Sequence, residues 1–319
     1  MLRYVFGLIF ALAACLTFAG TLTVTSPTTG AYVGTTNSLN FNITGAQVQV
    51  TVTVAVTYPT GAKSTFNQEF SPDTSGDITG SMALDFTESD PQGVYTINVS
   101  ATEPGNTYAP TVLSVTLLPQ PPVFTAYSPA SGNFVKGVVQ IRATLQDTYL
   151  QGWRVQVNGQ DIANNTGTTD TVAVAWDTSG IVQDGPQTIT IAATDLANNT
   201  TTKTITLTVL RVPPILTITY PTSGTKLVPG ADISIVLSIQ SEFAGAVDKT
   251  GVTVLAEKST GTFIAMASVI SFTSGTTSVW NGRIRYQAGL LPKSFKIVAT
   301  AVDRAGNAAV PQTVNLTLQ

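Results

Sequence analysis

Apolar and polar residues alternate along most of this chain. The longest such run, QVQVTVTVAVTY at 47–58, puts five valines on one face of an extended segment: Val48, Val50, Val52, Val54 and Val56. Shorter alternating runs occupy 95–101, 188–194 and 294–300. A period of two residues predicts half-buried strands, and no convincing helical period occurs beyond the N-terminal segment. The pattern therefore predicts an all-β protein.

Three internal repeats organise the chain. Their openings are TLTVTSPTTGAYV, VFTAYSPASGNFV and ILTITYPTSGTKL. The matching positions are Pro27, Pro129 and Pro221, then Gly30, Gly132 and Gly224, then Val33, Val135 and Leu227. Because Pro fixes φ and Gly allows positive φ, each opening is predicted to be a strand that ends in a turn.

The second half of each repeat matches more closely. LDFTESDPQGVYTINVSATEPGN, from Leu84, aligns with WDTSGIVQDGPQTITIAATD, from Trp176, and with WNGRIRYQAGLLPKSFKIVATAVDRAGN, from Trp280. Each copy passes through a Gly/Pro turn and an alternating strand to a turn that runs from Glu or Asp to Asn. About seven short strands per hundred residues predict antiparallel β-sandwiches.

Proline-rich segments at 118–122 and 211–214 separate the repeats and favour short, stiff linkers. The predicted organisation is a signal peptide at 1–19, a divergent first domain at 20–120, a second domain at 121–211 and a third at 212–319.

The first twenty residues, MLRYVFGLIFALAACLTFAG, have the form of a secretory signal peptide. Its apolar run is shorter than the roughly 20 residues that span a bilayer. Two processing routes stay open: cleavage after Ala19, or lipidation of Cys15, which follows Leu12-Ala13-Ala14 as in a bacterial lipoprotein. Both routes predict an exported protein of the cell envelope or the extracellular space, and the second adds a lipid anchor to the membrane.

Composition removes several classes of function. The chain of 319 residues has 15 Lys and Arg, 18 Asp and Glu, no His and one Cys. These numbers exclude His-based catalysis, an internal disulfide and a cysteine zinc site. Charged residues make up only 10% of the chain, against about 25% in an average globular protein, which argues against nucleic-acid binding. The 53 Thr residues instead favour strands with a neutral, hydroxyl-rich surface.

The chain resembles the bacterial immunoglobulin-like domain family. In the second repeat the resemblance lies in VQVNG at 155–159, WDTSG at 176–180, and DGPQTITIAATD followed by LANN at 184–199. The third repeat has ATAVDRAGN at 299–307, and the first keeps only Asp85 and SATEPGN at 100–106. The resemblance implies Ig-like sandwiches that serve as spacers, stalks or adhesive modules of exported proteins, or as appendages of glycoside hydrolases.

Several acidic loops offer oxygen atoms to a Ca²⁺ ion. The loops at 195–199 and 303–307 each supply one carboxylate, whereas a hard cation needs six to eight oxygens, several of them carboxylate. We therefore predict hairpin turns there, with Asp and Asn bonded to backbone. The densest acidic set lies in the first repeat: Asp73, Asp77, Glu88 and Asp90. No cofactor is predicted, and Ca²⁺ is the one ion kept for a test.

Aromatic residues are the candidates for a ligand surface. Trp176 and Trp280 occupy equivalent positions and are predicted to be core residues. Trp153 with nearby Tyr149 is the candidate for an exposed aromatic surface that stacks on sugar rings. Asp184 and Asp195 come nearest to a catalytic carboxylate pair but fall in separate predicted turns, so no enzyme is predicted.

The sequence favours a non-catalytic, exported tandem Ig-like protein that acts as a spacer or adhesive module. The alternative is a carbohydrate-binding protein with a defined site near Trp153 or in the grooves between repeats. A polysaccharide or another surface protein is the expected partner. Self-association through strand edges stays open, and neither the ligand nor the oligomeric state follows from the sequence.

Overall fold

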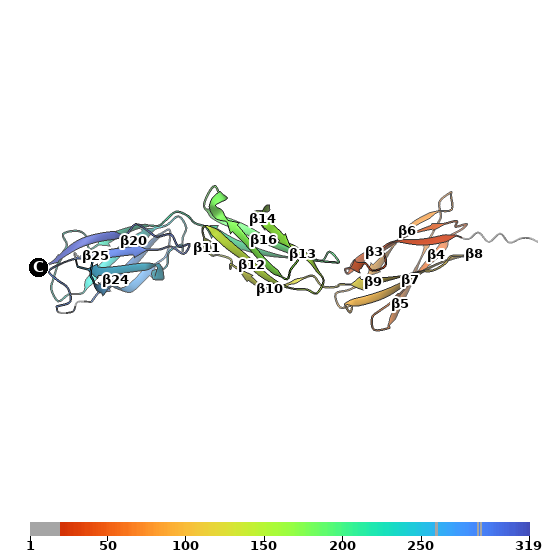
Figure 1. Ribbon diagram of the computed structural model, residues 1–319, viewed down its shortest axis with the longest axis horizontal. Helices are drawn as coiled ribbons and strands as arrows, with labels where there is room; N and C mark the ends of the chain where they lie inside the picture. The colour runs from red at the N-terminus through yellow and green to blue at the C-terminus, as the bar shows by residue number, and fades with distance from the viewer. Residues whose placement is uncertain (1–19, 259–260, 286, 288) are drawn as a thin grey trace, which may run out of the picture. The chain divides into compact units, whose positions relative to one another are not determined.

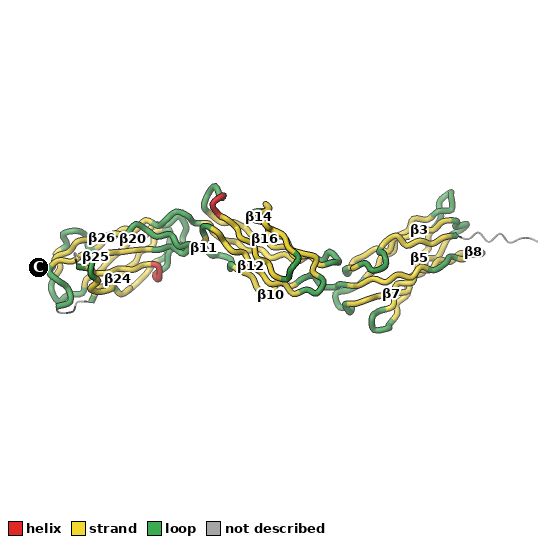
Figure 2. Tube along the Cα trace, viewed as in Figure 1, coloured by secondary structure: helices red, strands yellow, loops and turns green. Residues whose placement is uncertain are grey.

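The computed structural model describes residues 20–258, 261–285, 287 and 289–319. The predicted signal peptide, with Cys15, lies outside the described residues. Strands dominate the described chain, and its only helical segments are two 3₁₀ turns, Thr178–Gly180 and Lys249–Gly251 (Figures 1 and 2). No helix among the described residues has the length and apolar character to cross a bilayer.

The first repeat forms two sheets. Its strands are β1 (Thr21–Ser26), β2 (Tyr32–Val33), β3 (Thr36–Thr44), β4 (Val50–Thr57), β5 (Lys63–Phe70), β6 (Ile78–Asp85), β7 (Gly93–Glu103), β8 (Asn106–Thr107) and β9 (Thr111–Leu117). One sheet has the order β1-β3-β6 and the other the order β2-β9-β7-β4-β5, with β8 paired to β7. Residues from both sheets share one hydrophobic core, so the two sheets form a sandwich.

The second repeat follows the same plan. Its strands are β10 (Val123–Ser128), β11 (Phe134–Val135), β12 (Val138–Gln146), β13 (Leu150–Val157), β14 (Gln160–Gly167), β15 (Thr171–Asp177), β16 (Gly185–Asp195) and β17 (Thr200–Val209). The sheet orders are β10-β12-β15 and β11-β17-β16-β13-β14.

The third repeat has strands β18 (Ile215–Tyr220), β19 (Lys226–Leu227), β20 (Ile233–Gln240), β21 (Val252–Glu257), β22 (Phe263–Met266), β23 (Ser268–Thr273), β24 (Thr277–Ile284), β25 (Ser294–Ala301) and β26 (Gln312–Leu318). They form sheets of order β18-β20-β24-β23 and β19-β26-β25-β21-β22, which enclose one core. The all-β, Ig-like sandwich fold predicted from the alternating pattern is thus the observed fold.

The core follows the alternation of the sequence. Along β4 the side chains of Val50, Val52, Val54 and Val56 are buried and the intervening ones are half-buried. Val48 breaks the predicted ridge, because the strand starts at Val50 and Val48 is 47% exposed. Burying one face of a strand against the facing sheet sets its register, since a slip of one residue would expose that whole face.

The opening turn has the same geometry in every repeat. A cis peptide bond precedes each matched proline, Pro27, Pro129 and Pro221. The matched glycines Gly30, Gly132 and Gly224 have φ of 86°, 85° and 84°, as the turn prediction requires. After this turn a two-residue strand pairs in parallel with the last strand of the same repeat: β2 with β9, β11 with β17 and β19 with β26.

By its internal contacts the chain divides into two compact units. One contains the described residues up to Val123 together with Asp147–Gln151 and Ala193–Thr201, and the other contains the remaining described residues. Two loops of the second repeat therefore belong to the unit of the first repeat. The boundaries 20–120, 121–211 and 212–319 stay a prediction.

Candidate functional site

The polar feature that recurs in all three repeats is the turn after the long alternating strand. We call these segments the closing turns: 103–106 after β7, 195–199 after β16 and 303–307 after β25. Each begins with a buried carboxylate, because Glu103, Asp195 and Asp303 are only 8%, 0% and 5% exposed. A buried charge is costly unless hydrogen bonds compensate it, so the partners of these groups decide what each turn can do.

In the second repeat the turn's own N–H groups surround the carboxylate. Asp195 Oδ1 accepts from the backbone N–H groups of Ala197 at 2.8 Å and Asn199 at 2.9 Å. Its Oδ2 accepts from the Asn199 side-chain amide at 2.8 Å. Asn198 takes the left-handed conformation, with φ of 65°, that closes the turn.

The third repeat reproduces this arrangement. Asp303 Oδ1 accepts from the N–H groups of Ala305 at 2.9 Å and Asn307 at 2.8 Å, and Oδ2 accepts from the Asn307 amide at 2.7 Å. Gly306, with φ of 83°, takes the left-handed position that Asn198 holds in the second repeat.

The first repeat uses a longer side chain. Glu103 accepts from the backbone N–H groups of Gln47 and Val48, from the Asn106 amide at 2.8 Å and from the Tyr108 hydroxyl at 2.7 Å. Burial raises the pKa of Glu103, but the hydrogen bonds from Val48, Tyr108, Asn106 and Gln47 outweigh it and hold the pKa below its ordinary value. Burial and the neighbouring carboxylate raise the pKa of Tyr108.

These contacts make the closing turns unsuited to Ca²⁺. N–H donors occupy both oxygens of Asp195 and of Asp303, and the amide presents its nitrogen rather than its oxygen to the carboxylate. Across the described ranges, no group of three or more Asp, Glu, Cys or His side chains is placed to hold a metal ion. The turn interpretation of the segments at 195–199 and 303–307 agrees with this geometry.

The acidic set of the first repeat also consists of turn residues. Asp73 accepts from the N–H groups of Ser75 and Asp77, and these bonds, with that of Asp77 the strongest, lower its pKa. Asp90 accepts from the N–H and hydroxyl groups of Thr87. Both carboxylates therefore stabilise their own loops.

The expectation of an exposed ring at Trp153 is wrong. The residue is only 9% exposed, and its Nε1 donates to the Thr169 carbonyl at 3.0 Å. The ring lies on Gly167, where a Cβ atom would come within 2.3 Å of it. A glycine opposite a tryptophan on the paired strand was the signal that sequence reasoning missed.

Tyr149 does not join Trp153 in one aromatic surface. It is half-buried, and its ring packs at a tilt of 50° against Tyr32, with 5.5 Å between the ring centroids. Both tyrosines belong to the first compact unit. Trp176 and Trp280 are buried, as predicted for core residues.

Asp184 and Asp195 have separate partners. Asp184 accepts from the backbone N–H and the Nε of Arg211, at 2.5 and 2.6 Å. Burial raises the pKa of Asp184, but its hydrogen bonds to Arg211 and the positive charge of that residue produce a net lowering. An ionised carboxylate that is held by arginine is a poor general acid, so this candidate pair supports no hydrolase.

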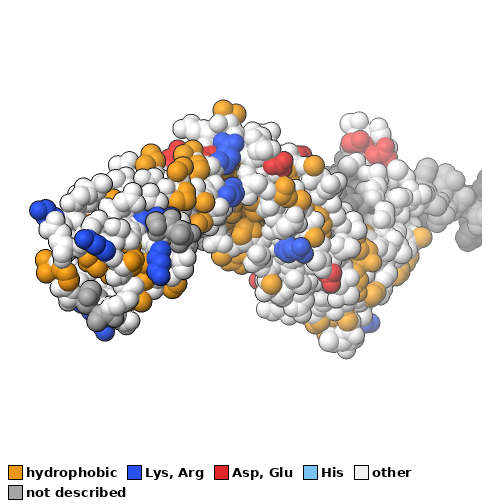
Figure 3. Space-filling view, turned by 60° about the vertical axis from the view of Figure 1, so that its left-hand side comes forward, with side chains coloured by type: hydrophobic (Ala, Val, Ile, Leu, Met, Phe, Trp, Pro, Cys, Tyr) orange, Lys and Arg blue, Asp and Glu red, His pale blue; other side chains and the backbone are white. Residues whose placement is uncertain are grey.

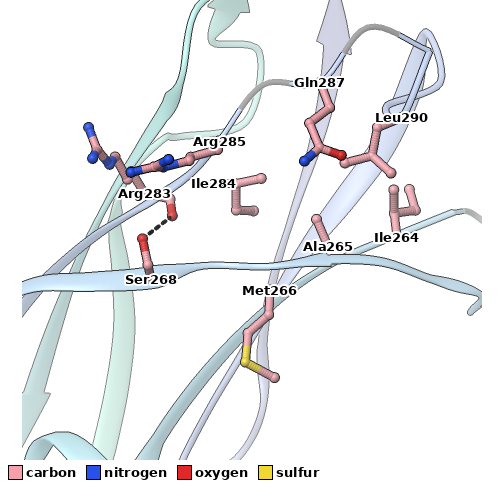
Figure 4. Close-up of a pocket in the computed structure, with 9 residues that line it drawn as sticks. All are labelled: Ile264, Ala265, Met266, Ser268, Arg283, Ile284, Arg285, Gln287 and Leu290. Carbon is pink, nitrogen blue, oxygen red and sulfur yellow. Dashed lines mark hydrogen bonds between the residues drawn. The ribbon is translucent and has the colours of Figure 1, made fainter.

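Two hollows lie in the second compact unit. One, of about 440 Å³, is lined by aliphatic side chains of β22, by Leu290 and by Arg283, Arg285 and Gln287, while Ser268 donates to the Arg283 carbonyl (Figure 4). Arg283 also pairs with Asp232 at 3.4 Å. The other, of about 590 Å³, lies beside Asp184, Arg211 and Glu242. Both hollows are open, and neither brings together a nucleophile and a base.

On the outer face of the larger sheet in the first repeat, strands β4, β7 and β9 carry rows that are mostly Thr and Ser. Two of these rows end in charged residues on β5, Glu69 beside Thr51 and Lys63 beside Thr57. Register aligns Thr51 with Thr102, Thr53 with Ser100, and Thr57 with Thr96 and then Ser114. In the third repeat the corresponding pairs include Leu255 with Val298 and Glu257 with Lys296. Figure 3 shows a molecular face on which charged side chains are few and scattered. We call the aligned residues of the first repeat the hydroxyl face.

The fold and these sites define an Ig-like, tandem β-sandwich protein whose repeated polar residues stabilise its turns. No family model and no curated protein matches the chain. Among solved structures, the fibronectin(III)-like modules of Clostridium thermocellum CbhA align with a TM-score of 0.39 and 15% identity, over 62% of this chain and 94% of theirs. A chain from a structure of a 1.5-MDa bacterial ice-binding adhesin aligns with a TM-score of 0.30 and 17% identity, over 94% of this chain and 97% of that chain. Such low scores carry no argument about function.

Proposed function

We propose that this chain is a non-catalytic, exported module in which tandem Ig-like sandwiches act as a spacer and present an adhesive surface. The observation that carries the proposal is the use of the repeated polar residues. The carboxylates that recur in the three closing turns, Glu103, Asp195 and Asp303, accept hydrogen bonds from backbone N–H groups and so hold their turns together. Residues used in this way build a repeated scaffold, and recognition falls to the sheet faces.

The hydroxyl face is the surface that best fits an adhesive role. Neighbouring strands lie about 4.8 Å apart and alternate residues about 7 Å apart along a strand, so its hydroxyl and amide groups form a regular array. Such an array donates and accepts hydrogen bonds without charge. A neutral polymer with many hydroxyl groups, such as a cell-wall polysaccharide, matches that chemistry.

The test is co-sedimentation of purified Gly20–Gln319 with insoluble polysaccharides and isolated cell walls. We expect saturable retention on one material that its soluble fragments compete away. The double variant T53E/T96E places charges on the hydroxyl face. It should weaken retention about tenfold or more, because it disrupts several hydrogen bonds of about 1 kcal/mol each.

The matched control is T79E/S81E, which alters two exposed residues on β6 in the smaller sheet of the same repeat. It should leave retention unchanged. Equal retention of both variants would remove the hydroxyl face as the adhesive surface. Absence of retention on every material would leave a spacer, or a protein that binds another surface protein.

The alternative is a carbohydrate site near Trp153, but the ring of Trp153 is buried. The Tyr32–Tyr149 pair is the remaining aromatic candidate for a sugar-binding surface, since Tyr32 is 39% exposed. Loss of retention in Y32A with normal retention in T53E/T96E would favour this site.

A further inference from the structure

The first two repeats have the same backbone arrangement at the point where the chain leaves the last strand. Leu118 and Leu210 directly follow the last strands β9 and β17, and both are buried. Their N–H groups donate to the carbonyls of Val33 at 2.8 Å and Val135 at 3.0 Å. The carbonyl groups of Leu118 and Leu210 also need hydrogen-bond donors. Both residues stand at the start of a proline-rich linker, where the chain has few N–H groups to offer.

The closing turn of the following repeat supplies that donor. Asn199 Nδ2 donates to the Leu118 carbonyl at 2.8 Å, and both residues belong to the first compact unit. Asn307 Nδ2 donates to the Leu210 carbonyl at 2.9 Å, and both belong to the second unit. The two pairs have the same chemistry at equivalent positions of the repeat.

The buried aspartate aims the amide. Asn199 and Asn307 each share Nδ2 between a linker carbonyl and the Oδ2 of Asp195 or Asp303. An amide nitrogen has two hydrogens, so one reaches the carboxylate and the other the carbonyl. Because an ionised carboxylate can only accept hydrogen bonds, it binds the amide nitrogen and not the amide oxygen. The same nitrogen is thereby directed at the linker carbonyl.

The first repeat provides an internal comparison. The amide of Asn106 bonds Glu103 at 2.8 Å and lies 3.4 Å from the Gly45 carbonyl, within its own repeat. Its turn has the shorter spacing Glu103-x-x-Asn106, whereas the other two follow Asp-x-Ala-x-Asn. Only the longer turns reach a residue that leads into a linker.

We propose that Asp-x-Ala-x-Asn is a linker clasp, in which one side-chain amide limits bending at each joint. We define joint 1 as the Leu118–Asn199 bond with its surroundings, and joint 2 as the Leu210–Asn307 bond with its surroundings. The inference rests on the proposed spacer function and gives it a mechanism. A spacer transmits position only when its joints are stiff, and linked domains with small interfaces otherwise move freely.

The experiment measures distance distributions between spin labels by pulsed electron resonance on the chain 20–319. That chain contains no Cys, so a spin label attaches only to the two cysteines introduced for each measurement. Exposed Ser81 and Thr171, each changed to Cys, report on joint 1, and Thr171 with Thr277 reports on joint 2. We expect narrow distributions for both pairs.

Asn199→Ala should broaden the joint 1 distribution about twofold or more, toward freely moving domains, and leave joint 2 narrow. Asn307→Ala should do the reverse. The matched control Asn106→Ala removes an amide from a closing turn that reaches no linker, and should broaden neither. Broad distributions in the unaltered protein, or unchanged widths in both Asn variants, would overturn the clasp.

A second variant approaches joint 1 from the other side. A Cβ atom at Gly34 would lie 2.7 Å from Asn199 Oδ1, so Gly34→Ala should displace the Asn199 amide without replacing any residue of the closing turn. It should broaden joint 1 as Asn199→Ala does. Because none of these measurements uses a polysaccharide, failure of the clasp and failure of adhesion are separate results.

Discussion

The two joints place the same amide against different neighbours. At joint 1 the Asn199 oxygen faces Gly34, where no side chain fits. At joint 2 the equivalent position is Lys136, whose Nζ donates to Asn307 Oδ1 at 2.9 Å and to the Gly306 carbonyl at 2.7 Å. The preceding aromatic residue also differs in its contact, since Tyr32 packs on Tyr149 while Phe134 lies 5.9 Å from the Arg304 guanidinium. A shared clasp therefore tolerates an apolar or a cationic setting.

The largest effect is expected from removing the buried aspartate carboxylate that each joint contains. Asp195→Ala and Asp303→Ala each leave buried N–H donors without an acceptor, which should destabilise the affected repeat by about 2–4 kcal/mol. Denaturant unfolding followed by tryptophan fluorescence measures this, because Trp280 is the one tryptophan of the third repeat. The exposed Asp170→Ala in the second repeat and Glu242→Ala in the third are the controls, because they lie in the same repeats as the tested residues. Midpoints equal to those of the controls would show that the carboxylates do not support the turns.

The stability of the first repeat should depend on pH through Glu103. The lowered pKa of Glu103 means that its contribution is complete above the ordinary value of 4.5 and is lost as pH falls through the folded-state pKa. Glu103→Gln should therefore cost about 1–2 kcal/mol at neutral pH, and the difference from the unaltered protein should vanish in acid. Unfolding curves from pH 7 downward test this. A constant difference at every pH would contradict it.

Lys136→Ala should make joint 2 resemble joint 1. Lys136 is exposed, so its loss should change the stability of the third repeat by less than about 1 kcal/mol. The distance distribution across joint 2 should broaden, but less than in Asn307→Ala, because the Asn307–Leu210 bond remains. Broadening as large as that of Asn307→Ala would assign the clasp to the lysine rather than to the amide.

Removal of metal ions should have no effect at either joint. The carboxylates of Asp195 and Asp303 already accept N–H bonds from their own turns, and each turn supplies a single carboxylate, whereas a hard cation needs six to eight oxygens. Melting temperatures with EDTA and with added Ca²⁺ should coincide. A rise in melting temperature with Ca²⁺ would revive the acidic loops as a binding site.

Local chemistry made much of the fold predictable. The alternating runs gave β4, β7, β16 and β25, and the matched Pro and Gly positions gave the opening turns. The turn interpretation of 195–199 and 303–307 also followed from residue type, since Asp and Asn bond nearby backbone. Trp153 could not be placed in this way, because its burial depends on Gly167 across a strand pair.

The clasp was beyond the reach of the sequence for the same reason. Asn199 is 81 residues from Leu118, and Asn307 is 97 residues from Leu210. The repeats reveal that Asp and Asn recur together, but not that one amide hydrogen points away from the turn.

The sequence alone thus determined the strand content, the three repeats and the chemistry of their turns, because these depend on neighbours within a few residues. The tertiary structure decided which aromatic rings are buried and which carbonyl each asparagine reaches. Those outcomes depend on contacts between strands and linkers that are distant in the chain, and only folding brings these segments within hydrogen-bond distance.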